Sequence, residues 1–353
     1  MTAQRALVCG ASGFIGGHLV RRLAAEGFSV RAADCVEPRY GDLPCDEFAL
    51  VDLRRAEGCS RALEGPRFDH VYQLAADMGG MEYLASANAE IMHDNVLINA
   101  HMADAAGRAG VSRYFYSSSV CVYRDMVPGE PELGEADAYP ALPDNEYGWE
   151  KLYSERLVSV LGERYGMATR IARFQNCYGP LGCWSGVRAK APAAICRKVA
   201  EAPTGGTIDV IGDGSAVRSF VFVDDLIEGV RLLMDSDLAG PTNLGTKEYV
   251  TVRELVATVI DVAGKSLSIR TVDGPVGVQS RNFSNERIES LGYRPTTMLR
   301  QGIARTYPWV AAQVRECGNA GMRSDSMRKC IAEMLRRVPR VVDVLRRWDG
   351  VGD

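Results

Sequence analysis

Histidine is scarce in this sequence, and the common metal-site and hydrolase motifs are missing. Four histidines occur among the 353 residues, and none stands in a spacing such as His-Glu-x-x-His. No Gly-x-Ser-x-Gly elbow is present, and the ten cysteines form no Cys-x-x-Cys pair. The sequence therefore predicts no bound metal, no serine hydrolase of this kind, and reduced thiols rather than disulfides.

Long apolar runs and a strong excess of one charge are also missing. A membrane-spanning helix needs about 18 or more apolar residues in a row, and no such run occurs. The net charge of -4 gives no general reason to bind nucleic acid or an anionic membrane. The chain enters a predicted strand almost at once, without the pattern of a signal peptide. We expect a cytoplasmic protein with one large or two moderate domains.

A glycine-rich turn is the first strong positive signal. Residues 6–9 predict a buried strand, and a helix is predicted to about residue 26. Between them the glycines are spaced Gly-x-x-Gly-x-x-Gly, which lets the backbone approach a pyrophosphate at the helix N-terminus. An ordinary strand-to-helix turn is the alternative. The residues predicted to contact a dinucleotide here are Gly10, Gly13, Phe14, Ile15 and Gly16.

The next strand, predicted over residues 28–33, ends at an acidic residue. Asp34 can accept hydrogen bonds from both hydroxyls of the adenosine ribose and repel a 2′-phosphate. This favours NAD over NADP, although Arg31 and Arg39 lie close by in the sequence.

Two further predicted strands end in residues suited to the same cofactor. The strand at 48–51 runs into Asp52 and Leu53, which we expect to contact the edge of the adenine. The strand at 69–74 runs into Ala75, whose small side chain leaves room for a dinucleotide.

A tyrosine and a lysine occur four residues apart in a predicted helix. Tyr147 and Lys151 then lie on one face, and the ammonium group should lower the tyrosine pKa from about 10. Tyr-x-x-x-Lys alone is weak evidence for catalysis. Ser119 follows a fifth predicted strand, at the edge where open α/β sheets bind ligands. If strand geometry continues, Cys121 faces the same side as Ser119.

The alternation of strands and helices predicts an α/β fold, a Rossmann-type doubly wound parallel sheet. We expect this domain to cover residues 1–178, with later segments returning to it. A smaller substrate-binding domain is expected over 179–312, and an Arg-rich amphipathic helical tail over 313–353. In the helix predicted over 87–109, Asn95 and Asn99 share one face. They are either solvent-exposed polar residues or residues with a function.

Together these motifs resemble the extended short-chain dehydrogenases/reductases that act on nucleotide sugars, over roughly residues 5–310. Within that superfamily the chain is similar to the GDP-mannose 3,5-epimerase family. The Met-Gly-Gly-Met loop at 78–81 and the Lys-Ala-Pro-Ala-Ala run at 190–194 are the most specific likenesses. Further likenesses lie in residues 45–48, 51–54, 118–123 and 196–198.

The resemblance implies a reaction through a 4-keto sugar with NAD regenerated. Tyr147 would take the proton of the sugar 4-hydroxyl, Lys151 would hold the cofactor ribose, and Ser119 would bind the same sugar oxygen. A 4-keto group makes the protons on C3 and C5 acidic. Cys121 and Lys190 would then serve as acid and base on opposite faces, although a core cysteine and a solvated lysine are the alternatives.

The resemblance also implies the substrate and its contacts. GDP-mannose would be converted to GDP-L-galactose or GDP-L-gulose, and the sequence does not separate inversion at C3, at C5 or at both. A homodimer would form through the helices near 87–109 and 146–166. The implied substrate-binding residues are Gly79, Ser119, Cys121, Asn176, Lys190, Lys198, Arg218 and Arg281.

Other functions fit the residues less well. An NAD-dependent C4-epimerase of another nucleotide sugar needs only the tyrosine and hydride transfer, and leaves Cys121 and Lys190 without a role. A 4,6-dehydratase is expected to carry an acidic pair where Val120 and Cys121 stand. A catalytically inactive NAD-binding regulator would not need the intact set of Ser119, Tyr147 and Lys151.

Overall fold

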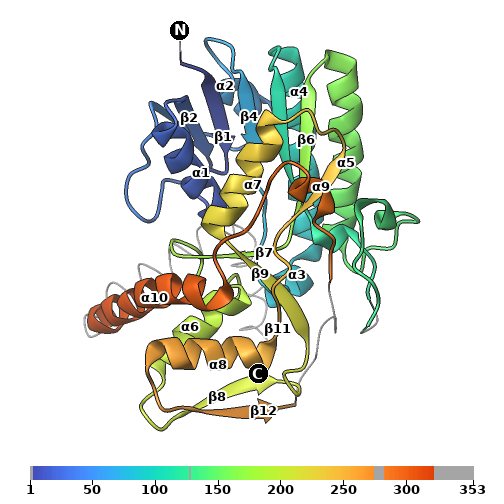
Figure 1. Ribbon diagram of the computed structural model, residues 1–353. Helices are drawn as coiled ribbons and strands as arrows, with labels where there is room; N and C mark the ends of the chain where they lie inside the picture. Colours follow the sequence, from blue (N-terminus) through green and yellow to red (C-terminus); the bar gives the residue numbers. More distant parts are fainter. Residues whose placement is uncertain (1–2, 127–128, 274–281, 322–353) are drawn as a thin grey trace, which may run out of the picture.

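A seven-stranded sheet forms the larger part of the molecule (Figure 1). The computed structural model describes residues 3–126, 129–273 and 282–321. All neighbouring strands of the sheet are parallel, in the order β10-β6-β5-β4-β1-β2-β3. This confirms the predicted Rossmann-type sheet. Its strands are β1 (Arg5–Cys9), β2 (Ser29–Asp34), β3 (Glu47–Leu50), β4 (His70–Gln73), β5 (Arg113–Ser119), β6 (Ala168–Phe174) and β10 (Pro241–Leu244).

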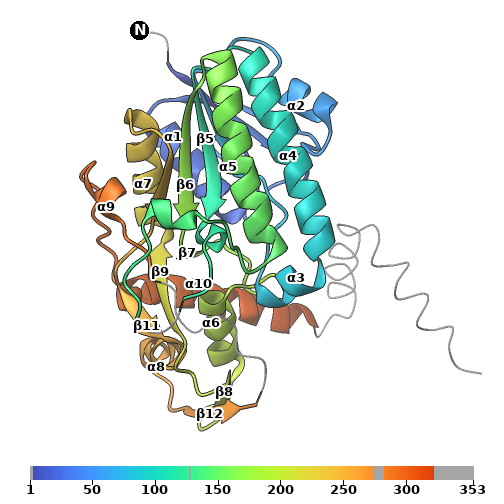
Figure 2. The ribbon, with the colours of Figure 1, turned by 90° about the vertical axis from the view of Figure 1, so that its right-hand side faces the viewer.

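Helices cover both faces of this sheet (Figures 1 and 2). One face packs against α1 (Phe14–Ala25) and α7 (Val223–Asp235), and the other against α2 (Ala56–Ala62), α4 (Asn88–Arg108) and α5 (Glu146–Tyr165). Strand β1 shows why such strands read as continuous apolar runs. Alternate residues, Ala6 and Val8 or Leu7 and Cys9, enter the cores on opposite faces.

A smaller layer lies beyond the carboxyl ends of the parallel strands (Figure 1). It contains a three-stranded sheet and a two-stranded sheet, with three helices packed against one another. Its strands are β7 (Asn176–Tyr178), β8 (Thr207–Ile211), β9 (Val217–Phe222), β11 (Tyr249–Thr251) and β12 (Ser268–Val272). Its helices are α6 (Ala191–Glu201), α8 (Val252–Ala263) and α10 (Leu299–Gly321).

Later segments return from this layer to the large sheet. Helix α7 packs on the sheet beside α1, and β10 pairs with β6 at the sheet edge. Helix α10 continues past residue 313, where a separate tail was expected to begin. The rest of that expected tail, 322–353, lies outside the described residues.

Four short elements complete the described helices and turns of 3-10 helix. They are α3 (Met81–Ser86), α9 (Glu286–Glu289), η1 (Val120–Val122) and η2 (Glu135–Ala138).

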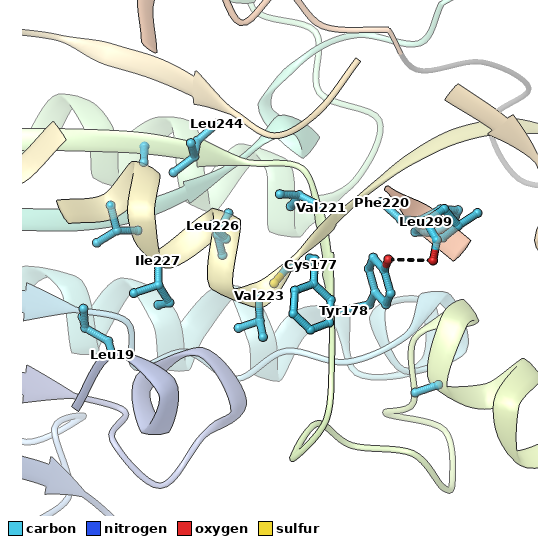
Figure 3. Close-up of a cluster of buried hydrophobic side chains, with 14 of the residues drawn as sticks. Leu19, Cys177, Tyr178, Phe220, Val221, Val223, Leu226, Ile227, Leu244 and Leu299 are labelled. Carbon is cyan, nitrogen blue, oxygen red and sulfur yellow. Dashed lines mark hydrogen bonds between the residues drawn. The ribbon is translucent and has the colours of Figure 1, made fainter. Parts of the chain in front are cut away.

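One apolar cluster joins the two layers (Figure 3). Leu19 of α1 and Leu226 of α7 belong to it, as do Phe220 of β9 and Leu299 of α10. Tyr178 donates a hydrogen bond to the carbonyl oxygen of Leu299 at 3.2 Å. The small layer therefore shares a continuous core with the large sheet.

A buried ion pair ties together the elements below the carboxyl end of β5. Arg173 of β6 donates to both carboxylate oxygens of Glu155, at 2.9 and 2.7 Å, and both side chains are almost fully buried. Its other amino group donates to the hydroxyl of Tyr123 at 2.9 Å and to the carbonyl of Glu135 at 2.8 Å. Ser118 also donates to Glu155. The strand end that leads to Ser119 is thus held from several sides.

We expect the substitution Arg173→Met to lower the free energy of unfolding by about 3–5 kcal/mol, because it leaves the Glu155 charge buried without its partner. Denaturant unfolding followed by circular dichroism measures the change. Arg108→Met is the control, since Arg108 pairs with Asp104 on an exposed helix face, where an ion pair contributes little. Equal effects of the two substitutions would contradict the prediction.

Candidate active site

The glycine turn packs against the end of β4. Gly10 has a φ of +77°, and a Cβ placed on it would lie 2.8 Å from the backbone N and Cα of Ala75. A Cβ on Gly16 would collide with the carbonyl oxygen of Gly10, whereas Gly13 donates its N–H to that oxygen at 3.1 Å. The turn therefore lies between β1 and β4, where the strand order reverses and such sheets bind dinucleotides.

Asp34 ends β2 beside this turn. Its carboxylate accepts hydrogen bonds from the N–H of Ser12 at 3.0 Å and the N–H of Val36 at 3.2 Å. Burial raises the pKa of Asp34, and these hydrogen bonds oppose the rise. The structure thus brings Asp34 next to the glycine turn, as the sequence predicts. Phe14 and Ile15 are the first two residues of α1 and are half-buried there.

The two residues after β3 that we expected to contact the adenine, Asp52 and Leu53, lie in different environments. Asp52 pairs with Arg54 at 2.8 Å, and this hydrogen bond lowers the pKa of Asp52. Arg54 also reaches Asp94 of α4 at 2.9 Å. Leu53 is buried in the core under the sheet. Only Asp52 of the two keeps a partly exposed side chain.

Ser119, Tyr147 and Lys151 come together where α5 packs against the end of β5. The Asn145 side chain caps α5 by accepting the N–H of Gly148 at 2.9 Å. Tyr147 forms a hydrogen bond with Ser119. The Lys151 ammonium donates to the carbonyl of Ser117 at 3.0 Å and lies 5.6 Å from the centre of the Tyr147 ring. All three predicted residues are buried.

The expectation that Lys151 lowers the pKa of Tyr147 is wrong for this structure. Burial raises the pKa of Tyr147 well above its ordinary value, Cys121 and Glu150 raise it further, and only the Ser119 hydrogen bond opposes them. Burial also lowers the pKa of Lys151. Desolvation is the largest cause of both shifts, because each charged form loses water.

Cys121 lies at the site, but the continuing strand that we expected to place it there is not present. Strand geometry ends at Ser119, and Val120–Val122 form a turn of 3-10 helix, so the alternation argument is wrong. Cys121 nevertheless packs against Tyr147, and a Cβ on Gly148 would collide with the Cys121 carbonyl. The tight fit of α5 against this turn, rather than strand alternation, determines where the thiol lies.

Lys190 approaches the same place from the smaller layer. It is the N-cap residue of α6 and is half-buried. Burial lowers its pKa, and Cys177 and Cys121 oppose that change. Cys121 and Lys190 are therefore close enough to interact electrostatically, although they come from different layers.

The remaining predicted substrate residues lie on several different elements of the two layers. A Cβ on Gly79 would meet Tyr83, and Asn176 donates to the carbonyl of Ser219 at 3.2 Å. Lys198 is exposed on α6, and Arg218 on β9 donates to the carbonyl of Val217 at 2.7 Å. Arg281 lies outside the described residues.

Sequence reasoning did not assign the polar residues beneath the site. Asn95 and Asn99 are fully buried, so the exposed alternative is wrong for both. Asn95 bonds to the backbone N–H and carbonyl of Asp77 at 2.6 and 3.0 Å. Asn99 donates to Glu150 at 2.6 Å. Their helical spacing was the available signal, and only the packing of α4 against α5 shows that this face is buried.

Within the described ranges, no group of three or more His, Cys, Asp or Glu side chains is placed to hold a metal ion. Among the helices of the described residues, none has both the length and the apolar character of a membrane span.

This fold and this grouping of side chains define a Rossmann-type protein with a dinucleotide site and a Tyr–Lys pair. Residues 6–245 match the NAD dependent epimerase/dehydratase family. The chain belongs to that family.

Its relatives include sugar-nucleotide epimerases. The chain is 43% identical to GDP-mannose 3,5-epimerase of Arabidopsis thaliana, over 88% of this chain and 82% of the relative. It is 42% identical to GDP-mannose 3,5-epimerase 1 of Oryza sativa subsp. japonica, over 88% and 83%. Among solved structures, UDP-glucose 4-epimerase of Thermus thermophilus, in complex with NAD, superimposes with a TM-score of 0.77 at 28% identity, over 87% of this chain and 99% of that one.

The described residues fit the cofactor that the family name gives. The glycine turn has no room for side chains at Gly10 and Gly16, as a tight dinucleotide-binding turn requires, and Asp34 ends β2 where the ribose of a dinucleotide is bound in such folds. NAD is thus the cofactor of this site, and when bound it supplies a hydride acceptor.

We expect Gly16→Ala to weaken NAD binding about tenfold or more, because its Cβ must displace the Gly10 carbonyl at a cost of about 1–3 kcal/mol. Isothermal titration with NAD measures the affinity. Gly17→Ala is the matched control in the same helical turn, since its Cβ meets Arg21 at 3.3 Å and the Ala11 carbonyl at 3.4 Å. Unchanged affinity of the Gly16 variant would contradict the prediction.

Proposed function

We propose that this protein is a GDP-mannose 3,5-epimerase, an isomerase that inverts C3, C5 or both through a transient 4-keto sugar. The observation that carries the proposal is the grouping of Cys121 with Ser119, Tyr147 and Lys151 at the end of β5, with Lys190 of the smaller layer within electrostatic range of Cys121. The printed names of the relatives at 43% and 42% identity support the substrate and the reaction. GDP-L-galactose and GDP-L-gulose are the expected products.

The oxidation of C4 assigns roles to three buried residues. Tyr147 in its phenolate form accepts the proton of the sugar 4-hydroxyl and becomes a neutral phenol, and Ser119 holds the same oxygen through a hydrogen bond. Lys151 would hold the ribose of the cofactor. Bound NAD would supply a hydride acceptor for C4 and, in its reduced form, the hydride donor, so that the overall reaction consumes no oxidant. Burial raises the pKa of Tyr147 and so favours its protonated phenol, which is the form that returns a proton to the C4 oxygen when the 4-keto group is reduced.

The inversion itself needs a base on one face of the sugar and an acid on the other. Cys121 and Lys190 are the pair we propose. One removes the acidic proton from C3 or C5, which leaves an enolate next to the 4-keto group, and the other returns a proton to the opposite face. Burial lowers the pKa of Lys190, which makes its neutral, basic form available nearer neutral pH.

A C4-epimerase of another nucleotide sugar is less consistent with this arrangement. It requires no second acid–base pair, and the approach of Cys121 and Lys190 would then serve no chemical purpose.

Further assignments belong to the same proposal. We assign cofactor binding to residues 1–178 together with α7 and β10. We assign substrate contacts to Gly79 and Asn176 of this part and to Lys198, Arg218 and Arg281 of residues 179–312. The cytoplasm is the proposed location, because none of the nine cysteines of the described ranges is in a disulfide.

We also propose a homodimer formed through α4 and α5, which lie side by side on one flank of the sheet (Figure 2). Three large side chains share one face of α5 and are strongly exposed: Trp149 at 42%, Tyr153 at 52% and Val160 at 55%. Met92 of α4 is exposed at 38%. A second copy would bury this apolar surface in a symmetric interface.

Proton NMR with GDP-mannose in deuterium oxide tests the reaction. We expect solvent deuterium at C3, C5 or both, and loss of that exchange by a factor of about 10²–10⁴ in Cys121→Ser and Lys190→Met. Cys317→Ser, on exposed α10, is the control that should keep full exchange. A configuration change at C4 without deuterium would favour the C4-epimerase. An unchanged substrate would reject GDP-mannose.

Sedimentation equilibrium tests the dimer. We expect the wild-type protein to sediment as a dimer and the double variant Tyr153→Asp, Val160→Asp to sediment as a monomer, because two buried charges oppose association. Met298→Asp places the same charge at another apolar residue, exposed at 54%, and should leave the dimer intact. A wild-type monomer, or a dimeric double variant, would contradict this interface.

A further inference from the structure

Arg188 connects the two layers of the molecule beside the candidate site. It lies in the segment that leads into α6, and its guanidinium donates to the Asp77 carboxylate at 2.7 Å and to the Met78 carbonyl at 3.1 Å. It also donates to the hydroxyl of Tyr83 and stacks 3.8 Å above the centre of that ring. One side chain thus makes two contacts with the loop that follows β4 and two with Tyr83 of α3.

The partners of Arg188 are themselves held in place. The Tyr83 hydroxyl donates to the second carboxylate oxygen of Asp77 at 2.8 Å. The buried Asn95 side chain bonds to both backbone polar groups of Asp77. Asp77 is therefore held in place by hydrogen bonds with Asn95 of α4 and Tyr83 of α3.

The backbones of the two loops also touch. A Cβ added to Gly80 would lie 2.7 Å from the carbonyl oxygen of Ala189 and 3.0 Å from that of Val187. The segment that carries Arg188 therefore lies directly against Gly80. Any shift of that segment would also shift Lys190, which comes two residues after Arg188 and caps α6.

We propose that Arg188 is a positioning residue, which holds Lys190 at the distance and angle that proton transfer to the sugar requires. This inference rests on the proposed function, because it assigns Lys190 the acid–base step. Arg188 acts through the loop and not on the substrate. A lysine cannot replace it, since a single ammonium group cannot make the forked hydrogen bonds and the stacking contact together.

The contacts of Arg188 predict that its loss affects the two steps of the reaction differently. Ser119, Tyr147 and Lys151, which serve the hydride step, belong to β5 and α5 and are held by Asn145 and Ser117. None of the Arg188 contacts described above is with Ser119, Tyr147 or Lys151. Loss of Arg188 should therefore slow proton exchange at C3 and C5 much more than oxidation at C4. A displacement of about 1 Å at a reacting group is enough to reduce a rate about 10²-fold.

The test compares Arg188→Lys with the wild-type enzyme carrying its NAD. Deuterium incorporation from solvent reports proton exchange at C3 and C5, and the absorbance of NADH formed after mixing with GDP-mannose reports the hydride step. Arg197→Lys is the matched control, because Arg197 lies on α6 and pairs with Glu201 of the same helix at 2.9 Å. Tyr83→Phe is a second, milder variant that keeps the stacked ring and removes the hydroxyl.

We expect Arg188→Lys to reduce deuterium exchange about 10- to 100-fold, with the rate of NADH formation and the KM changed by less than about threefold. Tyr83→Phe should change exchange in the same direction by a smaller factor, and Arg197→Lys should change neither rate. Thermal unfolding with NAD bound separates this pattern from a general loss of structure.

Two results would overturn the inference. If exchange and NADH formation fall in parallel, or if Arg188→Lys keeps full exchange, Arg188 does not position Lys190 while the proposed function stands. If the wild-type enzyme shows no exchange at all, the proposed function fails and this inference fails with it.

Discussion

The close packing of α5 against the turn after β5 determines how the candidate site is assembled. Gly148 leaves no room for a side chain beside the Cys121 carbonyl, so the start of α5 lies directly on that turn. The Asn145 cap fixes where the helix begins. As a result Tyr147 lies against Ser119 and Cys121, and Lys151 reaches the carbonyl of Ser117. A looser contact would separate the tyrosine from both residues.

Burial then decides the electrostatics of the site. Tyr147, Lys151 and Glu150 are all buried, and burial is the largest cause of each of their pKa shifts. The Tyr147 phenol and the neutral form of Lys151 are favoured together, in the opposite sense to the pair of charges that helical spacing alone suggests. Asn99 and Ser154 satisfy one oxygen of Glu150, so the layer beneath the site is polar but closed to solvent.

The small layer contributes what the parallel sheet alone does not have. Lys190 enters from the start of α6, and the contacts of Arg188 with Asp77 join its segment to the loop after β4. The apolar cluster around Tyr178 and Leu299 holds the same layer to α1 and α7. A site built between two such parts depends on both contacts, because a rotation about either one would move Lys190 away from Cys121.

Local sequence patterns determined most of the parallel sheet, the glycine turn, Asp34 and the shared helix face of Tyr147 and Lys151. Each of these follows from short-range rules, namely apolar runs, glycine spacing and helical periodicity. The sequence led us to expect that later segments return to the sheet, but only the tertiary structure decided that β10 is the edge strand, that Ser119 lies against Tyr147, that Asn95 and Asn99 are buried, and what Arg188 contacts. They depend on which distant segments meet, and single residues carry no local signal of that. Cys121 shows both sides: the sequence predicted that it faces the site, but a turn of 3-10 helix and the packing of α5, rather than a continuing strand, bring it there.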